Sequence, residues 1–197
     1  MKRTTYLIAV LVALLVGCST GPAPQTYVLS SPSPIKGQIS IESGRPIVEL
    51  RSIRIPDFLD TTDIVTRRGR NELIVSPTGR WGERLSTGTT HAFAAALTRA
   101  LPTVTVAAPP LQGRSAAVLL IDIEAFDILA DGSCVLAARW TIQGADRGAP
   151  SVSANGSVSV PIVGGMTDAT IVSAMADAIQ KLADHMAISV QRVVEPG

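Results

Sequence analysis

Apolar and polar residues alternate along much of the chain with a two-residue period, which is typical of half-buried β-strands. The clearest case is 117–126 (AVLLIDIEAF), which is apolar at first and then alternates around Asp122 and Glu124. Gly69-Arg70-Asn71 and Asp131-Gly132 each predict a hairpin turn. The predicted strands are residues 27–29, 46–55, 64–68, 72–75, 104–107, 117–126, 135–143 and 152–160.

Two other segments carry their apolar residues at helical spacing. The first helix begins near Ser86 and ends at Leu101-Pro102, and the second begins near Asp168. Their apolar stripes are Thr89, Ala92, Phe93, Ala96, Leu97 and Ala100 in the first, and Ile171, Met175, Ala178, Leu182 and Met186 in the second. The pattern as a whole predicts an α/β fold in one domain, with a mixed, largely antiparallel sheet of five to seven strands packed with two main helices.

The N-terminus has the pattern of an export signal. Lys2 and Arg3 precede an apolar stretch, residues 6–16, which is too short to cross the roughly 30 Å hydrocarbon core of a bilayer. Leu15-Val16-Gly17-Cys18 then resembles the bacterial lipobox. The resemblance implies a signal peptide over 1–17, cleavage before Cys18, and acyl chains such as palmitate on that cysteine. The alternative is an ordinary secretory leader with a chance cysteine.

The residues after Cys18 are expected to act as a membrane tether. Residues 19–26 (STGPAPQT) are small, polar and proline-bearing, and eight extended residues reach at most about 26 Å. In the lipoprotein pattern, Ser19 is compatible with delivery to the outer membrane, on its periplasmic side. We therefore divide the chain into the leader, a lipidated N-terminus and flexible tether with a short strand over 18–37, and the folded domain over 38–197.

Charge and composition exclude several classes of function. The 17 basic and 16 acidic residues nearly balance, so no overall field would attract nucleic acid. Only His91 and His185 are present, and Cys134 is the one cysteine besides Cys18. No Gly-x-Ser-x-Gly elbow, metal-ligand spacing or Walker motif occurs. We expect a protein that is not an enzyme and has no cofactor or metal, apart from the covalent lipid on Cys18.

One segment has a residue pattern that is specific enough to compare with known families. Residues 55–60 (IPDFLD) continue through 63–67 (DIVTR) to Arg80-Trp81, before the first helix. The run resembles the IPxYLDxxQIVxR pattern of the ABC-type transport auxiliary lipoproteins, the PqiC-like family. Further matches lie at 27–30 (YVLS), 121–127 (IDIEAFD) and 138–140 (ARW). Departures are small, with Phe58 where Tyr is common, Asp63 where Gln is common, and Gly82 where Ala often follows the tryptophan.

The same segment supplies the candidate partner-binding residues. They are Ile55, Pro56, Asp57, Phe58, Leu59, Asp60, Arg67 and Trp81. Large apolar residues between aspartates could form an anchor within a polar rim, as in a protein contact. The alternative is a strand end and turn, with Phe58 or Leu59 in the core and Asp60 fixing the backbone. Trp81 would then be a core residue, and Arg67 a solvated or ion-paired strand residue.

The resemblance also implies a role. The family is a set of nonenzymatic subunits of transport systems built around MCE-domain proteins, with ABC or membrane permease components, which move lipids between the inner and outer membranes. A lipoprotein of this kind would be the outer-membrane end of the apparatus, and a homo-oligomer would fit. Two alternatives remain: a lipoprotein that itself carries a lipid or small hydrophobic ligand, and an envelope assembly scaffold.

Overall fold

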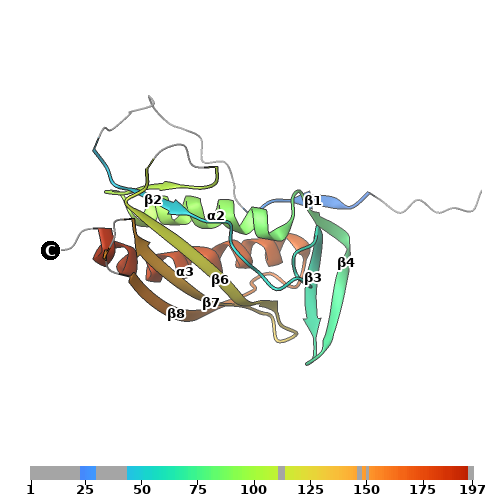
Figure 1. Cartoon of the computed structure of the whole chain (residues 1–197). Helices are drawn as coiled ribbons and strands as arrows, with labels where there is room; N and C mark the ends of the chain where they lie inside the picture. The colour runs from blue at the N-terminus through green and yellow to red at the C-terminus, as the bar shows by residue number, and fades with distance from the viewer. Residues whose placement is uncertain (1–22, 30–43, 111–113, 146–147, 150, 195–197) are drawn as a thin grey trace, which may run out of the picture.

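The computed structural model describes residues 23–29, 44–110, 114–145, 148–149 and 151–194 (Figure 1). The leader, Cys18 and most of the expected tether lie outside the described residues. Two sheets and two helices make up the described chain. The predicted α/β class, with mixed strands and two main helices, is confirmed, but the strands divide between two sheets instead of forming one.

The larger sheet has five strands in the order β5-β2-β6-β7-β8. Its long antiparallel part is a meander over β6, β7 and β8, and β2 pairs in parallel with both β5 and β6. The strands are β2 (Ile47–Leu50), β5 (Thr105–Ala107), β6 (Ala117–Ile128), β7 (Ser133–Gly144) and β8 (Ser151–Pro161). Burial alternates along β6 and β7, so one face of the sheet enters the core and the other meets solvent.

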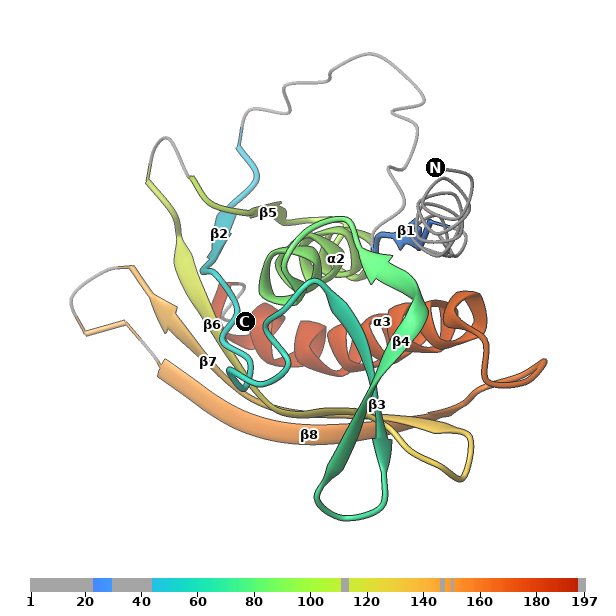
Figure 2. The same cartoon turned by 90° about the vertical axis from the view of Figure 1, so that its right-hand side faces the viewer.

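The smaller sheet has three strands and stands at one end of the larger one (Figures 1 and 2). β4 (Glu72–Trp81) lies in its centre, antiparallel to β3 (Asp63–Arg68) and parallel to β1 (Gln25–Tyr27). The first strand therefore begins and ends two residues before the predicted strand 27–29. Gln25 and Thr26 belong to the folded domain instead of the tether. Pairing with the edge of β4 gives these polar residues backbone partners that no side-chain pattern reveals.

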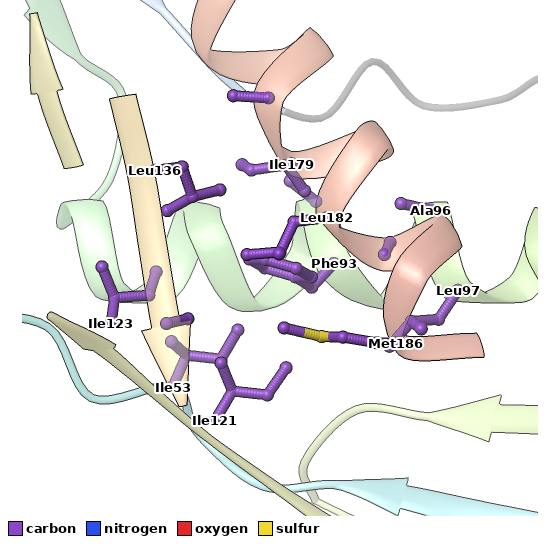
Figure 3. Packing of buried hydrophobic residues seen from close by; sticks show 14 of the residues in the cluster. Ile53, Phe93, Ala96, Leu97, Ile121, Ile123, Leu136, Ile179, Leu182 and Met186 are labelled. Atoms are coloured by element: carbon purple, nitrogen blue, oxygen red, sulfur yellow. The ribbon is translucent and has the colours of Figure 1, made fainter. Parts of the chain in front are cut away.

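Both helices pack on the same face of the larger sheet, as Figure 2 shows. α3 (Asp168–Val194) crosses β7 and β8, and α2 (Leu85–Ala100) packs beside α3. The core between them includes Phe93 from α2 and Leu182 and Met186 from α3, whose side chains meet in Figure 3. All three are fully buried, so the apolar stripes predicted from the sequence do face the sheet.

Two further strands end five or more residues away from their predicted ends. β2 ends at Leu50, not at Ile55, and only the isolated bridge between Arg54 and Asp122 continues its pairing. β4 runs on to Trp81, although its predicted end was residue 75. The cause is a bulge, because Val75 pairs with Val65 and Arg80 pairs with Asp63. The four residues 76–79 therefore stand opposite Ile64 alone, and the extra residues hide the strand period.

Candidate functional site

The candidate segment is a turn that leads from the larger sheet to the smaller one. Arg54 holds its start against β6, because its guanidinium donates to the Asp122 carboxylate, with Nη2 2.8 Å from Oδ2. The turn is closed by two backbone bonds, from Leu59 N–H to Pro56 O at 2.9 Å and from Asp60 N–H to Asp57 O at 3.2 Å. The segment therefore has a fixed backbone.

This turn separates the two large apolar residues. Leu59 enters the core and is 4% exposed, whereas Phe58 is 50% exposed. Asp57 beside it is also exposed, and Ile55 and Pro56 are half-buried. Phe58 is thus the side chain of this turn that offers a large apolar surface to solvent, with Asp57 as a polar neighbour.

Asp60 stabilises the N-terminus of α2 by direct hydrogen bonds, although it lies 26 residues before Ser86 in the sequence. Its Oδ1 accepts a hydrogen bond from Ser86 N–H at 3.0 Å, and its Oδ2 accepts from Arg84 Nε and Nη2 at 3.0 and 2.8 Å. Arg84 is the N-cap residue of α2 and makes no capping hydrogen bond with its own side chain. Asp60 therefore serves as the N-terminal cap of α2, where a negative charge also complements the helix dipole.

The environment of Asp60 alters its acidity. Partial burial acts to raise the pKa of this carboxyl group, but the hydrogen bonds from Arg84 and Ser86 outweigh it and hold the pKa below the usual range. A carboxyl group whose pKa is lower in the folded state stabilises the fold above its unfolded pKa, about 3.9. This contribution is lost as the pH falls through the folded pKa.

We expect Asp60→Ala to lower the free energy of unfolding by about 1 to 2 kcal/mol at pH 7, because α2 loses its cap and Arg84 its partner. Urea unfolding of the two proteins between pH 7 and pH 3 measures the difference, which should shrink as the pH falls below about 3.9. Asp57→Ala, at an exposed neighbouring carboxylate, is the control and should change little. A difference that grows toward acid pH would contradict the capping role.

Arg67 and Trp81 have structural partners. Arg67 donates from Nε and Nη2 to Asp127 Oδ1, at 2.9 and 2.7 Å, and so joins the β3–β4 hairpin to the end of β6. Trp81 is 5% exposed, and its backbone N–H donates to the backbone oxygen of Thr62 at 2.8 Å. In the structure, Trp81 is thus a core residue and Arg67 is an ion-paired strand residue, as the alternative interpretation of each expects. Of the predicted partner-binding residues, Phe58 and Asp57 remain the exposed pair.

A groove that the sequence did not indicate lies between the smaller sheet and the start of α3. Its volume is about 660 Å³, within the range of about 300–1,000 Å³ that is common for ligand sites. Its apolar lining includes Tyr27, Val75 and Met166, and the last two are about half exposed. Little in the sequence indicates this groove, since its lining comes from four separate segments and depends on the β4 bulge.

The bulge and the helix start form the polar end of this groove. Ser76 Oγ and Thr78 Oγ1 both donate to Asp168 Oδ2, at 3.0 and 2.7 Å. A Cβ at Gly79 would lie 2.6 Å from the carboxyl carbon of Asp168, so only glycine fits there without a shift. The two hydroxyl groups and the Asp168 carboxylate thus hydrogen-bond to one another, and these bonds hold the bulge against the first turn of α3.

The described residues offer little reactive chemistry. They contain no cluster of three or more His, Cys, Asp or Glu that could hold a metal ion. Cys134 is buried in β7, and burial raises the pKa of its thiol to about 12, so it stays protonated at neutral pH. His91 and His185 are both exposed on helices. Neither of the two described helices, α2 and α3, has the length and hydrophobicity that a transmembrane helix requires.

Two solved structures share the fold of this chain. Protein XCC0632 from Xanthomonas campestris, described under the family name DUF330, has a TM-score of 0.59 at 18% identity, over 86% of this chain and 96% of that chain. The crystal structure of an uncharacterized protein has a TM-score of 0.70 at 15% identity, over 85% and 99%. At these identities they show a shared fold. No curated protein matches the chain.

The model of one protein family covers nearly the whole described chain. It is the family described as the ABC-type transport auxiliary lipoprotein component, and it matches residues 27–187, from β1 to the second half of α3. The match spans both sheets and both helices, including the turn with Phe58 and the groove beside α3. The resemblance found in the sequence is thereby confirmed, and the chain belongs to the family of ABC-type transport auxiliary lipoproteins.

Proposed function

We propose that this protein is a lipid-anchored, nonenzymatic subunit of an MCE-type lipid transport system, and that it docks the transport apparatus at the periplasmic face of the outer membrane. The observation that carries the proposal is the family match over residues 27–187. The lipobox ending at Cys18 and the Ser19 that follows it support the location. The acylated Cys18 holds the domain at the membrane, and ABC or membrane permease components are further parts of the same system.

Tethering explains how a small docking surface suffices. Acyl chains contribute about 0.8 kcal/mol per buried methylene group, so several chains keep the protein on its membrane. A partner that reaches the same membrane then meets the domain at a high effective concentration. Phe58 fits such a contact, because a rigid turn presents its ring beside a carboxylate and ordering the loop costs little.

We expect Phe58→Asp to weaken capture of an MCE-domain partner by about thirtyfold, the effect of losing about 2 kcal/mol at an interface anchor. The measurement is copurification of the partner with the tagged lipoprotein from detergent-solubilised membranes. Thermal unfolding should be nearly unchanged, because Phe58 is half exposed in the free domain.

Ile188→Asp provides the matched control. Ile188 is 55% exposed and belongs to the second half of α3, and Figure 1 shows the C-terminal end of that helix on the opposite side of the molecule from β3, the strand that follows the turn. The Ile188→Asp substitution introduces the same charge on a different surface and should leave capture of the MCE-domain partner intact. Equal capture by folded Phe58→Asp would remove the turn as the anchor, and equal loss in both variants would indicate a nonspecific effect of charge.

The groove beside α3 favours a second candidate function, direct binding of a lipid or small hydrophobic ligand. Val75 and Met166 would give such a ligand an apolar wall, and Tyr27 lines the groove from β1. Mass spectrometry of the protein purified from native membranes separates the two functions. Stoichiometric noncovalent lipid favours the carrier, and copurified MCE protein without such lipid favours the docking subunit.

A further inference from the structure

The β8 edge of the larger sheet lacks a charged residue, a proline inside the strand and a bulge, which are common barriers to pairing with another strand. β8 ends the sheet, and β7 is the only described strand that pairs with it. Long edge strands usually carry a lysine, an internal proline or a bulge that prevents such pairing. The 11 residues of β8 (SVSANGSVSVP) include no charged side chain, and their register with β7 is continuous from Ser151 to Pro161.

The backbone of β8 leaves one set of polar groups without a strand partner. Ile162 N–H donates to Gly132 O at 2.8 Å, directly after the strand. Since alternate residues of a strand direct their N–H and C=O groups to the same edge, the even-numbered residues of β8 bond to β7. The N–H and C=O groups of the odd-numbered residues, from Ser151 to Ser159, therefore point to the open edge. Pro161 is also odd-numbered, so its missing N–H costs no bond to β7.

The sequence of β8 is nearly the same read in either direction from Asn155. Three of the four pairs of positions at equal distance from it hold identical residues, and the fourth holds alanine and glycine. The pairs are Ala154 and Gly156, Ser153 and Ser157, Val152 and Val158, and Ser151 and Ser159. Two copies of this strand placed antiparallel, with the Asn155 residues opposite each other, would set serine against serine and valine against valine.

We propose that β8 pairs with β8 of a second copy of this chain, antiparallel and centred on Asn155. The two larger sheets then become one continuous sheet related by a two-fold axis. The proposal rests on β8 alone and is independent of the transport role.

Side chains on both faces of β8 suit this pairing. On the solvent face, Thr141 and Ser153 already lie hydroxyl to hydroxyl across β7 and β8, at 3.0 Å, and paired serines of two copies repeat that contact. On the helix face, Val152 and Ala154 are only half-buried, unlike Val160 further along the strand. A neighbouring strand covers this half-buried apolar surface.

The charges near β8 and the position of β1 are also compatible with this pairing. Arg139 of β7 lies beside Asn155 and is ion-paired with Glu124, and the two copies of Arg139 would be three strand spacings, about 14 Å, apart. That distance exceeds the Debye length of about 10 Å at 0.1 M salt. A two-fold axis perpendicular to the sheet keeps β1 of both copies on the helix-covered side, seen in Figure 2, so both copies can be tethered to one membrane.

The test is disulfide formation between single cysteines in the full-length protein in its native membrane. Asn155→Cys should give a covalent dimer under mild oxidation, because this position is its own counterpart. Its two Cα atoms would be about 5.5 Å apart, within the disulfide range of about 4.4–6.8 Å. The native Cys134 does not interfere, because it is buried.

Ser151→Cys and Ser159→Cys are the matched controls. Each alone should give no dimer, since its own copies would be about 27 Å apart along the paired strands. Coexpressed, the two variants should cross-link with each other. The proposal is overturned if Asn155→Cys forms no more dimer than Ser151→Cys does alone.

Charge reversal supplies a second, independent test in the Asn155→Cys background. S153K/S157K places lysines opposite lysines and should lower the cross-linked fraction about tenfold, whereas S153K/S157E places opposite charges together and should retain it. Circular dichroism checks that both variants fold. Equal cross-linking by the two folded variants would contradict pairing in this register.

Discussion

Cys18→Ser is expected to abolish acylation of this protein. In the lipobox interpretation, the thiol of Cys18 is the group that receives the lipid, and a serine hydroxyl does not replace it in that modification. Cells fed an alkyne analogue of palmitate should label the wild-type protein and leave the variant unlabelled. The share of the protein in the outer-membrane fraction should fall as well, because the variant would lack the acyl chains of the proposed anchor.

Cys134→Ser is the control, because Cys134 lies in the core of the described chain and is 0% exposed. Labelling of this variant should equal that of the wild type, provided that immunoblots show equal amounts of protein. Undiminished labelling of Cys18→Ser would contradict the lipobox interpretation and favour the ordinary secretory leader.

Phe93→Ala is expected to destabilise the fold by about 3 to 5 kcal/mol, a large share of the total stability of about 5–15 kcal/mol for a typical domain. Phe93 is fully buried where α2 meets α3 and the larger sheet, and Leu182 and Met186 pack against its ring (Figure 3). Removing the ring leaves a cavity that these rigidly held neighbours fill only in part. The midpoint of urea unfolding measures the loss.

Two further substitutions make this result specific. Phe93→Leu keeps most of the apolar volume and should cost clearly less than Phe93→Ala. Ile188→Ala, at a side chain that is 55% exposed, should stay within about 0.5 kcal/mol of the wild type. If Phe93→Ala cost no more than Ile188→Ala, the packing of α2 against α3 described above would be wrong.

The sequence was sufficient for elements whose stability depends on local periodicity. The stripe that contains Phe93 and the one that contains Leu182 predicted both helices, because burial on one face imposes a helical period. Asp131-Gly132 predicted the β6–β7 hairpin, which the structure has, with Gly132 at φ +82°. The division into two sheets was not predictable, because strand partners depend on contacts between distant segments.

The candidate turn shows the same limit at the level of single residues. The sequence left open whether Phe58 or Leu59 enters the core, since the answer depends on the direction of the turn that Pro56 and Asp57 close. The role of Asp60 as a cap for α2 was equally hidden, because its partner Ser86 is 26 residues away. The groove was missed for a related reason: the residues that insert into β4 have no strand period.

The parallel pairing of β1 with β4 determines how the domain would bear a mechanical load. β1 is the first described strand after the expected anchor, so a force between the membrane and a docked partner would enter the domain through it. Gln25, Thr26 and Tyr27 lie in register with Gly79, Arg80 and Trp81. A pull along β1 shears these pairings together instead of opening them one at a time. The smaller sheet would therefore act as the force-bearing attachment between the tether and the rest of the fold.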